Sequence, residues 1–442
     1  MAELVIRGGT VMTVGSLGTL VGDVAIDGNR IVGIGTDVGR GDTEIDATGR
    51  IVMPGLVQAH VHLCQTLFRG LADDMDVIDW LRERVWPFER AHDAVSMRAS
   101  ADLGIAELML GGTTTVLSME SVHHTDESFA AADAAGIRAF IGKALMDRWE
   151  PGTEMVGEDT ETAWTDAVRL VEHWDGAAGG RLRVALSPRG PRNATPEMWR
   201  RCSDLAAEAD LRLHTHVNEN GPHADRLGAT PEGRDVVALE SWGALSERLV
   251  MAHCVWLDER ERDLVRLRGA HVCHCPSANL KLASGVAPIP EYMEMGINVA
   301  LGCDGAACNN RMDAFTEMRL AALVHKPRCG PKVMPAARVI ELATVGGATA
   351  LGIHDRVGRL EVGMLADVIV VGLDAPHAWP GAGSGPAERI VYASHATDVT
   401  DVVIDGRITV RDRQLVRVDL GQIRDAAESA RVDLLARAGL PI

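Results

Sequence analysis

Apolar runs of strand length recur through the middle of the chain, and each is followed by a segment long enough for a helix. This alternation is typical of βα units that build a parallel sheet. Eight such units over about 300 residues match the size of a (β/α)8 TIM barrel, so the predicted fold class is α/β. The predicted strands are residues 51–62, 114–119, 138–145, 182–188, 211–216, 249–254, 270–275 and 297–304.

Both ends of the chain show a different pattern, in which short alternating runs are separated by turn signals. Asp27-Gly28 is a hairpin signature between two such runs. Similar runs return at residues 367–371 and 399–407. We therefore expect both ends to form one small β-sandwich domain, with the barrel inserted between them. The predicted boundaries are residues 1–54 for the first part, 55–360 for the barrel, and 361–442 for the second part with a terminal helix.

Composition indicates an ordinary globular protein, since 46% of the 442 residues are hydrophobic and 24% are charged. The formal net charge of −18 disfavours nucleic acid and anionic membranes as partners and favours a neutral or cationic small substrate. No run of about 20 apolar residues predicts a membrane span, and the first residues lack a signal-peptide pattern. We therefore expect a cytoplasmic protein, and the eight scattered cysteines favour reduced thiols.

Histidines and an aspartate stand at the C-terminal ends of several predicted strands. His60 and His62 end the first strand, and their i, i+2 spacing places both on one face. Later strands supply further candidates at the same end, namely His214 and His216 in the fifth, His253 in the sixth and Asp304 in the eighth. Because a barrel keeps its chemistry at this edge, a shared metal site is predicted. Alternation leaves open which fifth-strand histidine is the ligand.

An isolated buried histidine is more often hydrogen-bonded within a core than bound to a metal. The metal interpretation is favoured here because the first-strand pair predicts matching groups at later strand ends, and these are present. Cys273-His274-Cys275 does not extend the site, because alternation directs the cysteines away from the histidine and no second cysteine pair has zinc spacing.

The candidate ligands suit one divalent metal ion with water in an open position. Nitrogen-rich ligation with one carboxylate favours Zn²⁺ and also tolerates Fe²⁺. Zinc lowers the pKa of a bound water to ~7, which supplies hydroxide at neutral pH. Glu219 can protonate a ring nitrogen of a heteroaromatic substrate while hydroxide attacks the adjacent carbon. His253 can orient the hydroxide, and Asp304 can pass the proton of the water to the leaving amine.

Longer motifs surround these residues. They are Pro54-Gly55-Leu56 before His60-Val61-His62, Gly111-Gly112-Thr113-Thr114-Thr115, His216-Val217-Asn218-Glu219, Ala252-His253-Cys254, the segment 274–282, the segment 304–310 and the segment 358–367. Together they make the chain resemble the amidohydrolase superfamily, specifically the branch of S-adenosylhomocysteine/methylthioadenosine deaminases and triazine hydrolases. The resemblance implies a mononuclear metal held by His60, His62, His216 and Asp304, with Glu219 and His253 in catalysis.

The resemblance also implies residues that bind the substrate. Glu89 matches the position where adenosine-type deaminases of this branch bind ribose hydroxyls. Lys143 and Arg189 stand where those enzymes have an arginine on the third strand and a histidine after the fourth, positions that line the pocket. Trp80 can stack on a flat ring, or it can pack against an aliphatic neighbour instead.

Three functions remain in competition. The first is hydrolytic deamination of an amino-substituted N-heterocycle of the purine, nucleoside or pterin type, with release of ammonia. The second is hydrolytic displacement of chloride or an amine from an s-triazine. The third is a non-catalytic scaffold with the same fold, which the intact ligand set disfavours. For the enzyme we expect a homo-oligomer of two or four subunits.

Overall fold

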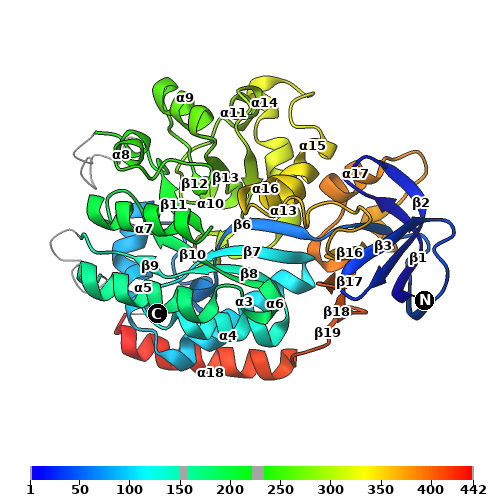
Figure 1. Ribbon diagram of the computed structural model, residues 1–442, viewed down its shortest axis with the longest axis horizontal. Helices are drawn as coiled ribbons and strands as arrows, with labels where there is room; N and C mark the ends of the chain where they lie inside the picture. Colours follow the sequence, from blue (N-terminus) through cyan, green and yellow to red (C-terminus); the bar gives the residue numbers. More distant parts are fainter. Residues whose placement is uncertain (1, 150–156, 222–232, 441–442) are drawn as a thin grey trace.

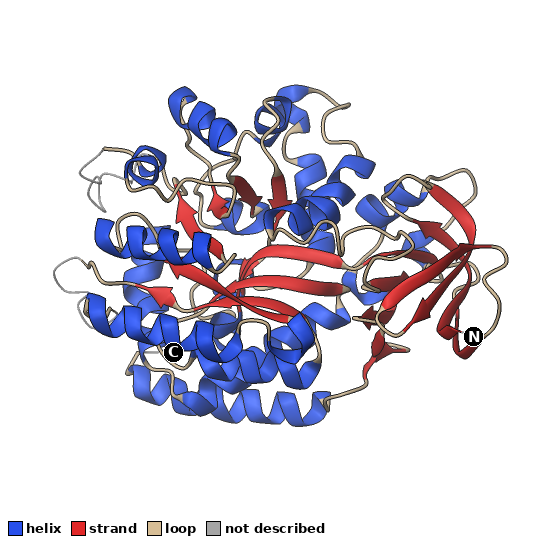
Figure 2. Ribbon diagram, viewed as in Figure 1, coloured by secondary structure: helices blue, strands red, loops and turns tan. Residues whose placement is uncertain are grey.

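The computed structural model describes residues 2–149, 157–221 and 233–440. A large unit of strands surrounded by helices carries a smaller sheet at one end, close to the N-terminus (Figure 1). The two sheets are separate, one parallel and enclosed by helices, the other built from both chain ends (Figure 2). The predicted α/β barrel with a second, small β domain is thereby confirmed.

The strands of the barrel sheet follow one another in chain order, each parallel to its neighbours. β15 (Asp304–Gly305) pairs with β6 through Asp304 and Val61, which closes the ring. The other strands are β6 (Leu56–His62), β7 (Thr113–Met119), β8 (Arg138–Gly142), β9 (Ala144–Leu145), β10 (Leu182–Pro188), β11 (Arg212–Val217), β12 (Leu249–His253), β13 (His271–His274) and β14 (Val299–Leu301). The eighth predicted strand is thus interrupted between β14 and β15.

The first predicted strand is split at Gly55, and the split separates the two sheets. β5 (Ile51–Pro54) pairs with strands of the small sheet, whereas β6 enters the barrel. A Cβ at Gly55 would lie 2.1 Å from Oγ1 of Thr114, so only glycine fits at this crossing. One continuous apolar run therefore serves two sheets.

The small sheet joins the two ends of the chain. β5 runs antiparallel to β16, so the N-terminal and C-terminal strands share one ladder. Buried apolar side chains from both ends, such as Ile6, Val52 and Val368, form its core. The remaining strands are β1 (Ala2–Met12), β2 (Thr19–Asp27), β3 (Arg30–Gly35), β4 (Gly41–Asp46), β16 (Val368–Val371), β17 (Val399–Ile404), β18 (Arg407–Arg411) and β19 (Gln414–Leu415).

Helices cover the outside of the barrel (Figure 2). Their ends follow local chemistry, because Thr195 caps α7 by accepting a hydrogen bond from the N–H of Met198 at 3.2 Å, and α4 ends at Gly136 with a φ of 90°. The main outer helices are α3 (Ala94–Leu110), α4 (Thr125–Ala135), α5 (Thr160–Trp174), α7 (Pro196–Glu208), α8 (Asp235–Ser241), α9 (Glu259–Arg268), α11 (Ile289–Glu294), α13 (Ala314–Leu323), α15 (Ala336–Glu341) and α18 (Leu420–Ala438). Within the described ranges, no helix is long and apolar enough to cross a membrane.

The segment after β6 folds into short helical pieces that lie over the barrel rim. Its side chains Leu67, Phe68, Ile78 and Phe88 are buried in one apolar cluster, so the segment is anchored to the barrel. The pieces are η1 (Leu63–Phe68), α1 (Val77–Trp80), η2 (Leu81–Val85) and α2 (Trp86–Arg90). They place Trp80 and Glu89 close to the end of β6.

Candidate active site

β6 carries the first two site residues to the inside of the barrel. His60 and His62 are buried, and the Nε2 atom of each lies 3.3 Å from Oδ1 of Asp304. Asp304 reaches this position because β15 pairs with β6. The side chain of Gln58 accepts a hydrogen bond from the N–H of Cys303 at 2.9 Å, which fixes the chain just before Asp304.

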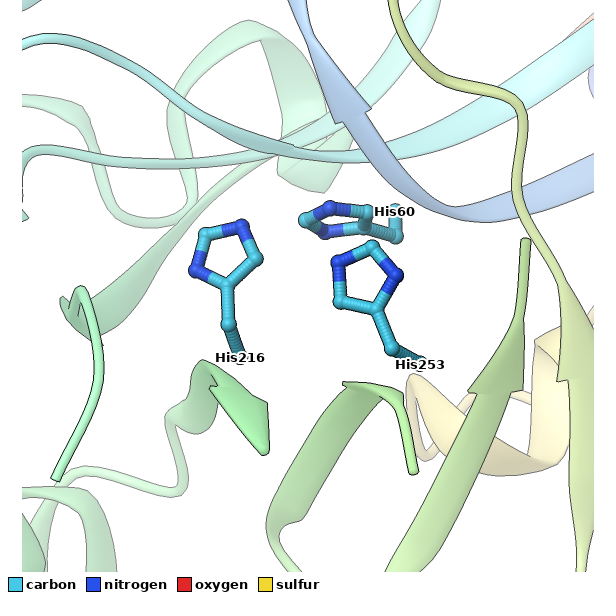
Figure 3. A group of neighbouring side chains, drawn as sticks. All are labelled: His60, His216 and His253. Atoms are coloured by element: carbon cyan, nitrogen blue, oxygen red, sulfur yellow. The ribbon is translucent and has the colours of Figure 1, made fainter. Parts of the chain in front are cut away.

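The structure separates the two histidines of the fifth strand. Nε2 of His216 lies 3.3 Å from Nε2 of His62, and the His216 ring converges with those of His60 and His253 (Figure 3). Two residues earlier on the strand, His214 lies deeper in the barrel, with Nε2 2.8 Å from Nδ1 of His60. His216 therefore joins the candidate ligands, whereas His214 contacts the far side of the His60 ring.

Hydrogen bonds behind the rings decide which nitrogen atoms face one another. Nδ1 of His62 donates to the carbonyl of Met119, and Nδ1 of His216 donates to the carbonyl of Arg189, both at 2.6 Å. Because a carbonyl only accepts, both Nε2 atoms carry lone pairs, and these face each other at 3.3 Å. Nε2 of His60 is buried without a hydrogen-bond partner among the described residues. Converging lone pairs beside a carboxylate fit a divalent cation, which removes their repulsion.

Burial sets the charge states of these groups. It lowers the pKa of His62 to about 3 and also lowers the pKa of His60 and His216, so the three rings are neutral. Burial by itself raises the pKa of Asp304, but the contacts of this carboxylate with His60, His253 and His62 outweigh burial and hold the pKa well below its usual range. Neutral imidazoles and an ionised carboxylate are the forms that bind metals.

His253 and Glu219 face the same centre from the ends of neighbouring strands. Nε2 of His253 lies 3.8 Å from Oε2 of Glu219 and 3.9 Å from Oδ2 of Asp304. Nδ1 of His253 is 2.9 Å from Oδ1 of Asn279, which directs Nε2 towards the two carboxyl groups. Burial raises the pKa of Glu219, whereas the net effect on Asp304 is a lowered pKa. Two carboxyl groups with pKa values displaced in opposite directions are suited to acid and base roles.

Two of these residues adopt an unfavourable backbone conformation. His253 has a φ of 72° and Asp304 a φ of 62°, in the left-handed region that non-glycine residues rarely occupy. Each such conformation costs about 1–3 kcal/mol and persists where the surroundings impose it. Both residues stand where a barrel strand ends, so the strain accompanies the turn that aims their side chains at the centre.

A cavity of about 300 Å³ opens beside the group. Trp80, predicted to stack on a ring, forms part of its wall, and so does Arg189. Further tryptophans in the wall are Trp86, Trp149 and Trp256. Glu219, His253 and Asp304 border the same space. An aromatic wall beside a few convergent polar groups suits a flat heterocycle.

The other two predicted substrate-binding residues, Glu89 and Lys143, are not among the described residues that line this cavity. Glu89 is buried and engaged by Arg189, with Nη2 of Arg189 3.1 Å from its Oε1, and by Gln65 at 3.0 Å. Lys143 is buried between Glu158, at 2.6 Å, and Asp166, at 2.7 Å. Glu89 and Lys143 are therefore paired inside the protein, and their contact with substrate stays a prediction.

Several groups that orient the site were missed in the sequence. Asn279 positions His253, Ser284 contacts Glu219 with 3.4 Å between Oγ and Oε1, and Gln65 lines the cavity while holding Glu89. Two more positions act through their carbonyls, those of Met119 and Arg189, and carbonyls leave no trace in residue type. For Asn279 the available signal was its place inside the conspicuous segment 274–282.

Comparisons with known proteins agree with this geometry. The Amidohydrolase family matches residues 51–409. A 5-methylthioadenosine/S-adenosylhomocysteine deaminase from Syntrophobacter fumaroxidans is 37% identical over 449 residues, covering 100% of this chain and 99% of the relative. A 5'-deoxyadenosine deaminase from Methanosarcina mazei is 35% identical over 441 residues, covering 99% of both chains.

Solved structures show the same likeness. An adenosine deaminase from Xanthomonas campestris with bound zinc has a TM-score of 0.91 and 30% identity, covering 98% of this chain and 99% of that one. An atrazine chlorohydrolase from Arthrobacter aurescens TC1 complexed with zinc has a TM-score of 0.89 and 27% identity, covering 97% and 100%. The resemblance read from the sequence motifs is confirmed.

Proposed function

Because this chain belongs to the amidohydrolase family and is a hydrolase acting on C–N bonds, we propose that it deaminates a purine-type heterocycle with the help of one divalent metal ion. Water replaces an exocyclic amino group of the ring, and ammonia leaves. Adenine-type nucleosides are the first candidate substrates, since the relatives that match over the full length are named for them.

The observation that carries the proposal is the pairing of Glu219 and Asp304 across His253. Burial raises the pKa of Glu219, which favours its role as donor of a proton to a ring nitrogen. Asp304, whose pKa lies well below its usual range, is ionised and can accept a proton. The pKa values of the two carboxyl groups are thus displaced in opposite directions, and both groups lie within 4 Å of one imidazole, at 3.8 and 3.9 Å.

Each residue then has a defined step. Glu219 protonates the ring nitrogen next to the carbon under attack, which makes that carbon more electrophilic. Asp304 accepts a proton from the attacking water and returns it to the amino group, which leaves as ammonia. His253, fixed by Asn279, stabilises the oxygen as it gains charge. His60, His62, His216 and Asp304 would hold a divalent ion, which would lower the pKa of water to ~7 and so make it a nucleophile at neutral pH.

The metal in this proposal is zinc, held by His60, His62, His216 and Asp304. Nitrogen donors with one carboxylate suit Zn²⁺, and Fe²⁺ remains compatible with the same set. Both solved structures described above contain zinc. His253 offers a further nitrogen close to His60 and His216.

Substrate recognition is proposed to rest on the cavity wall. Trp80 and the other tryptophans offer flat apolar surface to the ring. Arg189 keeps N–H groups beyond those that hold Glu89, and these can donate to an acceptor on the substrate. Glu89 and Gln65 would then act by holding the guanidinium group in place.

Displacement of chloride or an amine from a triazine is less well supported, because triazine hydrolases occur at 27% identity among solved structures whereas the full-length curated relatives are 34–37% identical deaminases. The scaffold hypothesis is set aside, since the chain is a hydrolase. Location in the cytoplasm and assembly into a dimer or tetramer stay predictions.

Ammonia release from a panel of aminopurines, adenine nucleosides, pterins and triazines tests the proposal directly. We expect metal-dependent ammonia release with an adenine-type compound as the preferred substrate. Chloride or alkylamine release from a triazine, without turnover of any aminopurine or pterin, would contradict it. Removal of the metal by a chelator should abolish the activity. Addition of Zn²⁺ or Fe²⁺ should restore it.

A further inference from the structure

A second and larger cavity, of about 1030 Å³, lies apart from the active site. It is bordered by α3, the start of α13, the segment 394–397 and α18, the helix along the lower edge of Figure 1. The two cavities share no lining residue among those described. We refer to the second cavity as the basic groove.

The groove gathers positive charge in a chain whose formal net charge is −18. Three acidic residues line it, Glu107, Asp313 and Glu428. Its arginines are Arg69, Arg311, Arg319, Arg413, Arg424 and Arg431. Such a concentration of guanidinium groups runs against the charge of the molecule as a whole.

Most of these cations are not neutralised by an acid. Among the described residues of the groove, only Arg69 forms an ion pair, with Glu107, and a second acid of the groove, Asp313, already accepts hydrogen bonds at the start of α13. Three further arginines donate to neutral carbonyls: Arg319 to that of Tyr392, Arg413 to those of Thr397 and Val399, and Arg431 to that of Arg69. Neutral carbonyls fix a guanidinium group in place but do not cancel its charge.

Arg311 and Arg424 are the freest of the group. Both are exposed, and neither forms an ion pair or hydrogen bond with any residue that the structure describes. They approach the groove from different elements, Arg311 from the segment before α13 and Arg424 from α18. A ligand in the groove could therefore contact arginines from two different elements.

We propose that the basic groove binds a small organic polyanion carrying at least two phosphate or sulfate groups. Guanidinium groups pair with tetrahedral oxyanions through two parallel hydrogen bonds, and several fixed ones in a concave site raise the local anion concentration. The volume exceeds what a single oxyanion needs and lies at the upper end of ligand sites of about 300–1,000 Å³. This site is independent of the deaminase cavity and of its metal.

The test uses 8-hydroxypyrene-1,3,6-trisulfonate, a fluorescent trisulfonate, as probe for the metal-loaded full-length protein. Fluorescence anisotropy is recorded at about 50 mM NaCl, where charge interactions are weakly screened. We expect saturable binding by the wild type, displaced by tripolyphosphate and weakened as the salt concentration rises. The Arg311→Glu/Arg424→Glu variant should bind at least ~10-fold more weakly, because two attractive charges become repulsive.

The matched control is Arg260→Glu/Arg266→Glu on α9, which lies at the opposite edge of the view from α18 in Figure 1. It makes the same change in net charge, and we expect its probe affinity to stay within about 2-fold of the wild type. Ammonia release should be unchanged in both variants. Absence of probe binding to the wild type, equal loss in both variants, or a change of oligomeric state in the groove variant alone would overturn the proposal.

Discussion

Two regions of the molecule bury charged side chains and differ in how these are satisfied. Where the barrel meets the small sheet, Arg138 of β8 donates to both carboxylate oxygens of Asp367, at 2.9 and 3.0 Å. The N–H of Asp405 donates to the same carboxylate at 2.8 Å. At the rim of the barrel, by contrast, Nε2 of His60 has no hydrogen-bond partner among the described residues, and the nearest polar atoms of Glu219 and His253 are 3.8 Å apart.

The difference distinguishes a structural cluster from a functional one. A buried polar atom without a partner costs about 1–3 kcal/mol, so such atoms persist where a ligand completes them. The junction is satisfied within the chain, whereas the rim leaves polar atoms that the proposed cation and substrate would satisfy. Substitutions at the junction should therefore change stability, and substitutions at the rim should change chemistry.

Asp304→Asn should have the largest effect. The variant loses an anionic metal ligand and the proton acceptor together, so we expect kcat/KM for ammonia release to fall by ~10⁴-fold or more. Its thermal unfolding should differ little from that of the metal-free wild type, because the amide preserves the shape. Activity within about 10-fold of the wild type would show that Asp304 has neither role.

Glu219→Gln should separate catalysis from metal binding. We expect kcat to fall by at least ~100-fold, because the amide cannot donate the proton of a carboxylic acid, while metal content by elemental analysis stays at the wild-type level. Glu259→Gln on the exposed start of α9 is the matched control and should keep full activity. Loss of the metal from Glu219→Gln would place this residue among the ligands instead.

Asp367→Ala tests the opposite side of the comparison. Removal of Asp367 leaves Arg138 with only Asp405, at 3.3 Å, so we expect the free energy of unfolding to fall by about 3 kcal/mol in urea titrations. The kcat of the folded fraction should be unchanged. Asp374→Ala, at an exposed position soon after β16, serves as the control and should cost less than about 0.5 kcal/mol. A fall in the kcat of the folded fraction of Asp367→Ala would contradict the distinction between the two regions.

Glu120→Gln should have the smallest effect, a change in how the free energy of unfolding depends on pH. Glu120 stands at the rim yet is satisfied within the chain by Ser118 and Ser128, and burial raises its pKa to about 7 from 4.5. The folded state thus holds a proton that the unfolded chain has lost, and this contribution to stability disappears as the pH rises from about 4.5 through 7.

The amide stays neutral, so the decline in unfolding free energy between about pH 5 and 8 should be shallower in Glu120→Gln by roughly 2 kcal/mol. Part of the decline should remain, because burial also raises the pKa of Glu317 to about 7. A pH profile of stability identical to the wild type would show that Glu120 is ionised throughout.

Much of the architecture could be predicted because barrel strands are short buried runs and their ends share one edge. His60, His62, His253 and Asp304 could be found by searching those ends. Alternation along a strand gives the face of a residue but not its depth, so it could not distinguish His214 from His216. The family resemblance favoured His216, and the contacts in the structure separate the two.

The surroundings of the cavity were less predictable, because the ion-pair partners of the charged residues there come from segments far apart in the chain. Lys143 is paired with Glu158 and Asp166, and Glu89 is paired with Arg189, 100 residues away. Nothing in the local sequence at Glu89 or Lys143 reports a partner at that separation. The pairs form only once the barrel closes.

The most direct test of the account is anomalous diffraction from crystals of the metal-loaded protein, recorded at the zinc edge. We predict one strong peak per chain, about 2.0–2.2 Å from Nε2 of His60, His62 and His216 and from the carboxylate of Asp304. A zinc-loaded crystal with no peak among these four side chains, or with its peak elsewhere, would contradict it.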